Sequence, residues 1–147
     1  MAEPFPFPFV SILIPARNEG IVIERTVQAM LALNYPKERL EILVIDDAST
    51  DDTPEVVEGI AARHRQVKLV RVPEGEGGKG KSRTLNVGLT HAVGDIIAVY
   101  DADNRPEPES LYYLVANLVE DQRLAAVLGK SPHDQPRPRL SRPVHQH

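Results

Sequence analysis

Short apolar runs rich in Val and Ile alternate along most of this chain with segments of helical spacing. The runs cover residues 10–14, 41–45, 67–72, 95–100 and 124–128, and the helical segments cover residues 24–33, 53–64, 82–91 and 108–121. Strands and helices in alternation are typical of a largely parallel sheet with helices on both faces. Apolar runs without polar alternation suit strands that are buried on both sides. With right-handed crossovers, the pattern predicts an α/β, Rossmann-like fold.

Three polar clusters stand at the carboxyl ends of predicted strands. They are residues 15–19 (Pro-Ala-Arg-Asn-Glu), 46–51 (Asp-Asp-Ala-Ser-Thr-Asp) and 101–103 (Asp-Ala-Asp). Ligands of open parallel sheets bind outside these strand ends. The clusters are far apart in the sequence, and we expect the topology to bring them together in one crevice.

Two adjacent carboxylates, Asp46 and Asp47, directly follow the second predicted strand. One interpretation is a turn held by side-chain hydrogen bonds, in which Ser49, Thr50 or Asp51 caps the next helix. Adjacent carboxylates repel each other, however, and need a cation, a hydrogen-bond donor or free solvent nearby. Asp47 is the better candidate for a ligand contact, because it lies further from the interior of the strand.

A second acidic pair, Asp101 and Asp103, follows the fourth predicted strand. Alternating side chains of an extended chain point the same way, so that these two carboxylates can share one divalent cation. Carboxylate oxygens suit Mg²⁺ or Mn²⁺, which keep coordination positions for water and substrate phosphate. The alternative is an ordinary solvated loop.

The glycine-rich residues 75–82 match the spacing of a triphosphate-binding loop. Residues 72–74 separate this loop from the preceding strand, however, and Glu74 and Glu76 bring negative charge to it. A mobile basic loop beside a diphosphate is a second interpretation, with Lys79, Lys81 or Arg83 as the counter-charge. A flexible solvated turn is the third.

The two ends differ in composition from the middle of the chain. Residues 1–8 alternate Phe with Pro in part, which predicts an extended lead. Residues 131–147 are rich in Pro, His and Arg and hold few aliphatic side chains, which predicts a disordered tail. His133, His145 and His147 match no metal-site spacing. The predicted folded domain therefore spans residues 9–130.

Cysteine content, charge and hydropathy exclude several classes of protein. The chain has no Cys, which excludes disulfides and thiolate zinc sites and fits a reducing compartment. A formal net charge of -4 argues against nucleic acid as a partner. No apolar run approaches the ~20 residues of a membrane span. We expect a cytoplasmic protein.

Taken together, the motifs resemble the family 2 glycosyltransferases of the GT-A fold. The matching segments are residues 10–19, 42–53, 81–89 and 95–103, in the family's order and spacing. The resemblance covers about residues 9–130 and implies a nucleotide-diphosphate-sugar donor and a divalent metal. It implies nucleotide contacts from Pro15, Arg17, Asn18, Glu19, Asp46, Asp47 and Lys81, with Asp47 at the base and Lys81 near the diphosphate. It also implies that Asp101 and Asp103 hold the metal, with Asp103 as the more direct ligand.

The family places its acceptor site and catalytic base in a second half, beyond the point near residue 130 where the resemblance ends. Glu107 and Glu109 lie outside the family's base motif, and we assign no catalytic base. The chain is therefore expected to be the donor-binding half of a longer enzyme, or to work with a partner or as an oligomer. Membrane association through a missing segment and the identity of the acceptor stay open. The alternatives are a non-catalytic nucleotide-binding or interaction module and a nucleotidyltransferase or phosphatase-like enzyme, and residues 81–89 argue against the latter.

Overall fold

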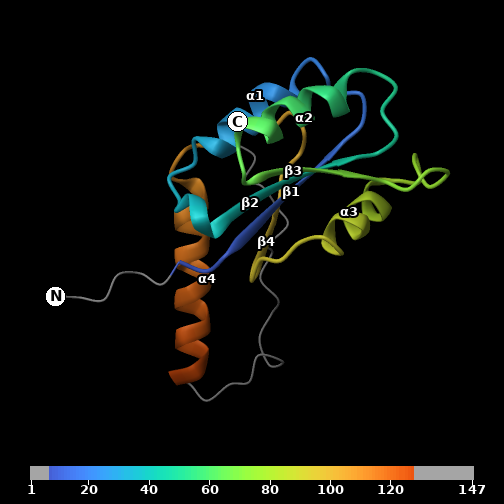
Figure 1. Ribbon diagram of the computed structural model, residues 1–147. Coiled ribbons are helices and arrows are strands. Elements are labelled where there is room, and N and C mark those ends of the chain that lie inside the picture. Colours follow the sequence, from blue (N-terminus) through green and yellow to red (C-terminus); the bar gives the residue numbers. More distant parts are fainter. Residues whose placement is uncertain (1–6, 128–147) are drawn as a thin grey trace.

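Four parallel strands form one sheet in the computed structural model, which describes residues 7–127 (Figure 1). The strands are β1 (Val10–Ala16), β2 (Leu40–Asp46), β3 (Val67–Arg71) and β4 (Ile96–Val99), in the order β3-β2-β1-β4. The helices are α1 (Ile23–Leu31), η1 (Lys37–Arg39), α2 (Thr53–Arg63), α3 (Lys81–Leu89) and α4 (Ser110–Val127). The parallel pairing of all neighbouring strands confirms the predicted fold class.

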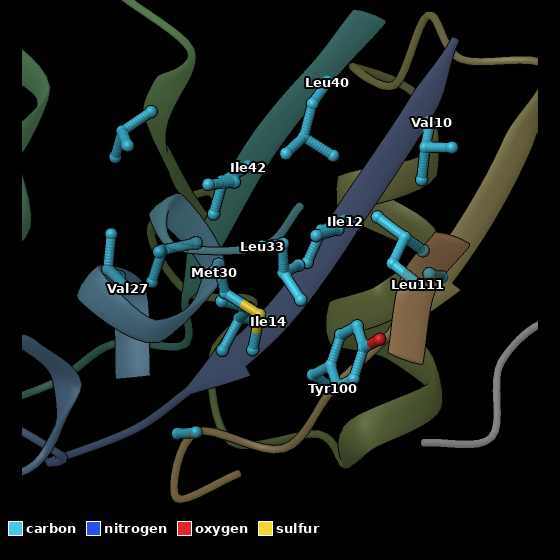
Figure 2. Packing of buried hydrophobic residues seen from close by; sticks show 14 of the residues in the cluster. Val10, Ile12, Ile14, Val27, Met30, Leu33, Leu40, Ile42, Tyr100 and Leu111 are labelled. Atoms are coloured by element: carbon cyan, nitrogen blue, oxygen red, sulfur yellow. The ribbon is translucent and has the colours of Figure 1, made fainter. Parts of the chain in front are cut away.

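The two central strands are buried on both faces, and alternate side chains enter two different cores. Ile12 and Ile42 lie in the larger core, together with residues of α1, α2 and α4, and Figure 2 shows this packing. Leu13 and Leu43 lie in the smaller core, against Leu85 of α3. This period of two is the direct consequence of the pleated strand. It explains why the runs in the sequence are apolar without interruption.

β1 continues through Pro15 to Ala16, whereas the predicted strand covered only residues 10–14. The carbonyl oxygen of Leu13 accepts a hydrogen bond from the backbone N–H of Tyr100, beyond β4. The carbonyl oxygen of Ala16 accepts one from the backbone N–H of Asp47, beyond β2. The backbone of Pro15 therefore faces the side of β4, and β4 has already ended at Val99. A proline is tolerated there because no strand partner needs its missing N–H.

The fifth strand predicted over residues 124–128 is wrong, because α4 extends as one helix to Val127. Leu111, Val115 and Ala125 are buried at helical spacing on one side of this helix. The run begins Leu-Ala-Ala, and no Gly or Pro separates it from the preceding helical residues. These are strong helix formers, and a short apolar run fits either element by its pattern alone.

Aromatic side chains anchor the segment that enters β1. The ring of Phe7 packs edge-on against Tyr35 at 5.1 Å between centroids and lies 5.9 Å from the ring of Tyr112. The Tyr35 hydroxyl donates a 2.6 Å hydrogen bond to the carbonyl oxygen of Pro8.

Residues 1–6 of the predicted lead and the predicted tail, residues 131–147, lie outside the described residues. Within the described part of the chain, no helix has the length and apolar character that crossing a bilayer requires.

Candidate functional site

A cavity of about 470 Å³ lies where the chain leaves β1, β2 and β4 and enters α3. This volume is within the usual range for small-molecule sites. Seven of the nine predicted site residues line it: Pro15, Arg17, Glu19, Asp47, Lys81, Asp101 and Asp103. The sheet topology therefore brings together residues up to 88 positions apart in the sequence.

Asn18 does not line the cavity and instead joins the loop after β1 to the loop after β2. Its side-chain Oδ1 accepts hydrogen bonds from the backbone N–H of Thr50 at 2.7 Å and of Asp51 at 3.2 Å. Its own N–H donates to the hydroxyl of Ser49 at 2.9 Å. Asn18 has a φ of 54°, a left-handed conformation that Asn tolerates better than most residues. Its position therefore indicates a structural contribution to the site.

Further hydrogen bonds join the same two loops, between residues 19–20 and residues 51–53. The N–H of Glu19 donates to the hydroxyl of Thr53 at 2.9 Å, and the N–H of Gly20 donates to Oδ2 of Asp51 at 3.0 Å. Asp51 also accepts the N–H of Thr53, the first residue of α2, at 2.9 Å. The N-cap position of α2 is Asp52, which makes no side-chain capping hydrogen bond, so none of the three predicted candidates is the N-cap; Asp51 precedes it and accepts the N–H of Thr53.

Asp47 holds the glycine-rich loop over the end of β2. Its Oδ1 accepts a 2.8 Å hydrogen bond from the backbone N–H of Gly78. Gly78 has a φ of 74°, and a Cβ added there would lie only 2.8 Å from Nη1 of Arg17. A Cβ added at Gly77 would lie 2.4 Å from that of Ala48. Glycine is therefore required at position 77 by the close approach to Ala48, and it is favoured at position 78 by the positive φ, since the guanidinium end of Arg17 can move.

Asp46 lies outside this cavity and lines a second hollow of about 490 Å³. Side chains alternate along a strand, so that Asp46 and Asp47 leave the end of β2 toward different sides. Asp46 is 4% exposed, and its Oδ2 accepts a long 3.4 Å hydrogen bond from the N–H of Ser49. Its Oδ1 has no hydrogen-bond partner among the described residues. The structure thus separates two carboxylates that the sequence grouped together.

The segment of Asp101 and Asp103 forms a turn beyond β4 and not a continued strand. Both carboxylates nevertheless line the cavity. Ala102, between them, is buried in the larger core, and its carbonyl oxygen accepts a hydrogen bond from the hydroxyl of Thr26 in α1. Thr26 is only 1% exposed. A buried side chain of α1 therefore positions the acidic turn, and nothing in the spacing of the sequence pointed to it.

Of the three lysine and arginine candidates for the counter-charge, Lys81 alone lines the cavity. It is the first residue of α3, and its ammonium group forms an ion pair with the carboxylate of Asp101. Arg83 pairs with Glu76 outside the cavity. Thr84 of α3 also lines the cavity and was missed. Its position three residues after Lys81, on the same helical face, is the signal that could have identified it.

Negative charge accumulates around Glu19. Burial raises the pKa of its carboxyl group, and the nearby carboxylates of Asp103 and Asp51 raise it further. A cation that arrives near Asp103 would relieve this repulsion.

Within residues 7–127, no three acidic or histidine side chains are close enough to hold a metal ion by themselves. Two carboxylates still fit Mg²⁺ or Mn²⁺, because these ions commonly bind through one or two carboxylates and take their other ligands from phosphate and water. The donor set of Asp101 and Asp103 is therefore of the right chemistry for a cation that arrives with a diphosphate.

Comparison with known proteins identifies a matching family and a similar curated protein. The model of the family "Glycosyl transferase family 2" matches residues 11–146, which extends past residue 130, near which the resemblance seen in the sequence ends. The chain is 48% identical over 123 residues to "Probable glycosyltransferase YdaM" of Bacillus subtilis (strain 168). That match covers 84% of this chain and 29% of the relative, so that the chain spans less than a third of the relative's length.

Two solved structures are similar in both sequence and fold. One is the mannosyltransferase PcManGT from Pyrobaculum calidifontis in complex with GDP-Man and Mn²⁺, with 37% identity, a TM-score of 0.67 and coverage of 74% of this chain and 31% of that one. The other is S. aureus TarS 1–349 in complex with UDP-GlcNAc, with 29% identity, a TM-score of 0.67 and coverage of 78% and 32%.

Proposed function

The chain belongs to glycosyl transferase family 2, and we propose that its cavity binds a nucleotide-diphosphate sugar together with a divalent cation, Mg²⁺ or Mn²⁺. The observation that carries the proposal is a single cavity that holds Lys81 and Arg17 beside Asp101 and Asp103. Such a site offers positive charge to a diphosphate and carboxylate oxygens to a cation. Complexes of two similar proteins with GDP-Man and Mn²⁺ or with UDP-GlcNAc support it.

The diphosphate is assigned to the start of α3. Lys81 supplies an ammonium group there, and the first N–H groups of a helix have no partners within the helix, so that they can donate to phosphate oxygens. Gly80, with a φ of 100°, brings the chain into this helix.

The nucleoside is assigned to the end of β2 and the loop after β1. Asp47 is 8% exposed, and its carboxylate can accept hydrogen bonds from the N–H groups of a base. Arg17 and Pro15 line the same cavity, and a guanidinium group can stack on an aromatic base. Asn18 acts indirectly, through the loops that it joins.

The cation is assigned to Asp101 and Asp103, whose turn Thr26 holds in place. When bound, a divalent cation neutralises charge on the diphosphate as the bond between sugar and phosphate breaks. Asp103 is exposed. It takes part in none of the hydrogen bonds or ion pairs described above, so that it can bind the ion without breaking one. Asp101 must first exchange its ion pair with Lys81.

Transfer of the sugar is proposed to require residues beyond those of the cavity. The chain spans 29% of its relative YdaM, and none of the described carboxylates is assigned as catalytic base. We expect this chain alone to bind the donor and to show weak or no transfer.

Isothermal titration with UDP and GDP, with and without Mn²⁺, tests the proposal. We expect at least one of them to bind more tightly when Mn²⁺ is present. Binding that is indifferent to the metal would favour a non-catalytic nucleotide-binding module, and no binding of either nucleotide would refute the assignment of the cavity. Robust sugar transfer by this chain alone would show that it holds its own base.

A further inference from the structure

Lys81 and Asp101 neutralise each other in the described structure. The ammonium group of Lys81 pairs with Oδ1 of Asp101, and both side chains line the same cavity. Their side chains are 56% and 36% exposed, so that the pair is open to solvent. An exposed ion pair contributes little to stability and can be exchanged for a better partner.

We propose that Lys81 is a tethered counter-cation that holds Asp101 in the absence of ligand and moves to the diphosphate when the donor binds. Lys81 would thereby weaken the binding of a divalent cation alone and strengthen its binding together with a nucleoside diphosphate. The inference rests on the function proposed above and adds to it the residue that couples the two ligands.

Helix stability does not explain why a lysine occupies this position. Lys81 is the first residue of α3, and the positive end of a helix dipole disfavours a cation. A lysine side chain is a flexible point charge, able to reach two partners in turn. Its placement instead satisfies the carboxylate of Asp101.

The charges of the cavity explain the coupling. Four carboxylates and two cationic side chains line it: Glu19, Asp47, Asp101 and Asp103 against Arg17 and Lys81. A divalent cation that approaches Asp101 alone meets the positive charge of Lys81 and competes with it. A diphosphate offers Lys81 a more negative partner, which frees Asp101 for the cation. The affinity of each ligand then depends on the other through a reciprocal coupling.

The test measures Mn²⁺ affinity by titration calorimetry, with and without UDP or GDP, in the unaltered chain and in Lys81→Met. We expect Lys81→Met to bind Mn²⁺ alone about threefold more tightly, since the competing cation is gone. We expect the gain in Mn²⁺ affinity on adding the nucleotide to fall by about tenfold. Lys81→Arg, which keeps the charge, should retain most of the coupling.

Arg83→Met is the matched control. It removes one positive charge from the same helix and breaks a comparably exposed ion pair, with Glu76, outside the cavity. It should change neither the affinity for Mn²⁺ alone nor the affinity for Mn²⁺ with nucleotide. This control separates the effect of Lys81 from that of net charge. Thermal unfolding confirms that each variant is folded, as expected from the exposure of both side chains.

The outcomes separate this inference from the proposed function. Equal affinities for Mn²⁺ alone in the unaltered chain and in Lys81→Met, with nucleotide binding still dependent on Mn²⁺, would overturn the inference and leave the function intact. An equal change in Lys81→Met and Arg83→Met would also overturn it. Absence of Mn²⁺ binding in every protein and condition would overturn both.

Discussion

The backbone N–H of Gly78 donates a 2.8 Å hydrogen bond to Oδ1 of Asp47. This contact holds the glycine-rich loop against the end of β2, and both residues line the cavity. The loop is therefore part of the site and not a free turn. It also means that a ligand that binds Asp47 must share that carboxylate with the loop or displace it.

Substitution of Gly78 by Ala is expected to weaken nucleotide binding. The residue has a φ of 74°, and the new Cβ would lie 2.8 Å from Nη1 of Arg17. We expect a loss of about 1 kcal/mol of stability from the left-handed backbone conformation and a shift of Arg17 away from its present position. Gly75→Ala is the matched control, because Gly75 has a φ of 82° and nothing within 4 Å of an added Cβ. Equal nucleotide affinity of the two variants in calorimetry would contradict the prediction.

Asn18 should matter for stability more than for direct ligand contact. Asn18→Ala removes the acceptor of the hydrogen bonds from Thr50 and Asp51 and leaves a left-handed φ without the residue type that tolerates it. We expect a loss of about 2 kcal/mol in urea unfolding. Asn18→Gly removes the same hydrogen bonds, but glycine adopts a left-handed φ without strain. This variant should therefore lose less stability than Asn18→Ala. If both variants unfold like the unaltered chain, the loops are held in some other way.

Thr26→Val should loosen the acidic turn while keeping the shape of the buried side chain. The carbonyl oxygen of Ala102 loses its donor, and we expect a loss of about 1–2 kcal/mol of stability. Mn²⁺ affinity in the presence of nucleotide should also fall, because Asp101 and Asp103 flank that carbonyl. Thr26→Ser keeps the hydroxyl and should retain the affinity better. Unchanged Mn²⁺ affinity in Thr26→Val would show that the turn holds itself.

Asp103→Ala should abolish the dependence of nucleotide binding on Mn²⁺ and leave folding nearly intact. Asp103 is exposed, lines the cavity and is the proposed metal ligand. Calorimetry with and without Mn²⁺, beside thermal unfolding, checks both parts. Glu107→Ala, another exposed carboxylate outside the cavity, is the control. A variant of Asp103 that fails to fold would identify a structural residue.

Stability at acidic pH should depend on Glu41, at the other end of the sheet. Burial raises the pKa of this carboxyl group, but hydrogen bonds from the Ser11 hydroxyl, the Val93 N–H and Lys68 outweigh burial and hold the pKa below its ordinary value of 4.5. A lowered pKa in the folded state stabilises the fold fully above pH 4.5, and this stabilisation is lost as the pH falls through the folded-state value.

Glu41→Gln should therefore destabilise the chain by about 3 kcal/mol near neutral pH, since it unpairs a buried network. The difference from the unaltered chain should shrink as the pH falls below 4.5. Urea unfolding across this range is the measurement. Lys68→Met, at a half-exposed side chain of the same pair, should have a smaller effect. A difference that is constant with pH would mean that Glu41 does not titrate as described.

Each of the four helices predicted from the sequence corresponds to a helix within residues 7–127, and four of the five predicted strands correspond to strands. Continuous Val and Ile runs identified four strands, because burial on both faces imposes that composition. The short run beginning at Leu124 misled, since its length and apolar character fit a helix or a strand equally. Pro15 misled in a different way. Whether a proline ends a strand depends on the neighbouring strand that its backbone faces, and that neighbour is distant in sequence.

The same distinction applies to the cavity. Strand ends in a parallel sheet share one edge, and this alone brought Arg17, Asp47 and Asp103 together in the prediction. The direction of the side chains separated Asp46 from Asp47. Hydrogen bonds to the loop after β2 gave Asn18 a structural role outside the cavity. Thr26 carried no signal, because a hydroxyl within an amphipathic helix resembles any other polar position until its partner is known.

By itself, the sequence determined the fold class, the edge at which the polar clusters meet and the family to which the motifs are similar. These follow from local composition and spacing, which are set by burial and by the period of each element. The tertiary structure alone decided that Gly78 contacts Asp47, that Lys81 neutralises Asp101 and that Asp46 lies in a separate hollow. Each of these depends on where a turn directs one side chain toward a residue far along the chain, and no local pattern records that direction.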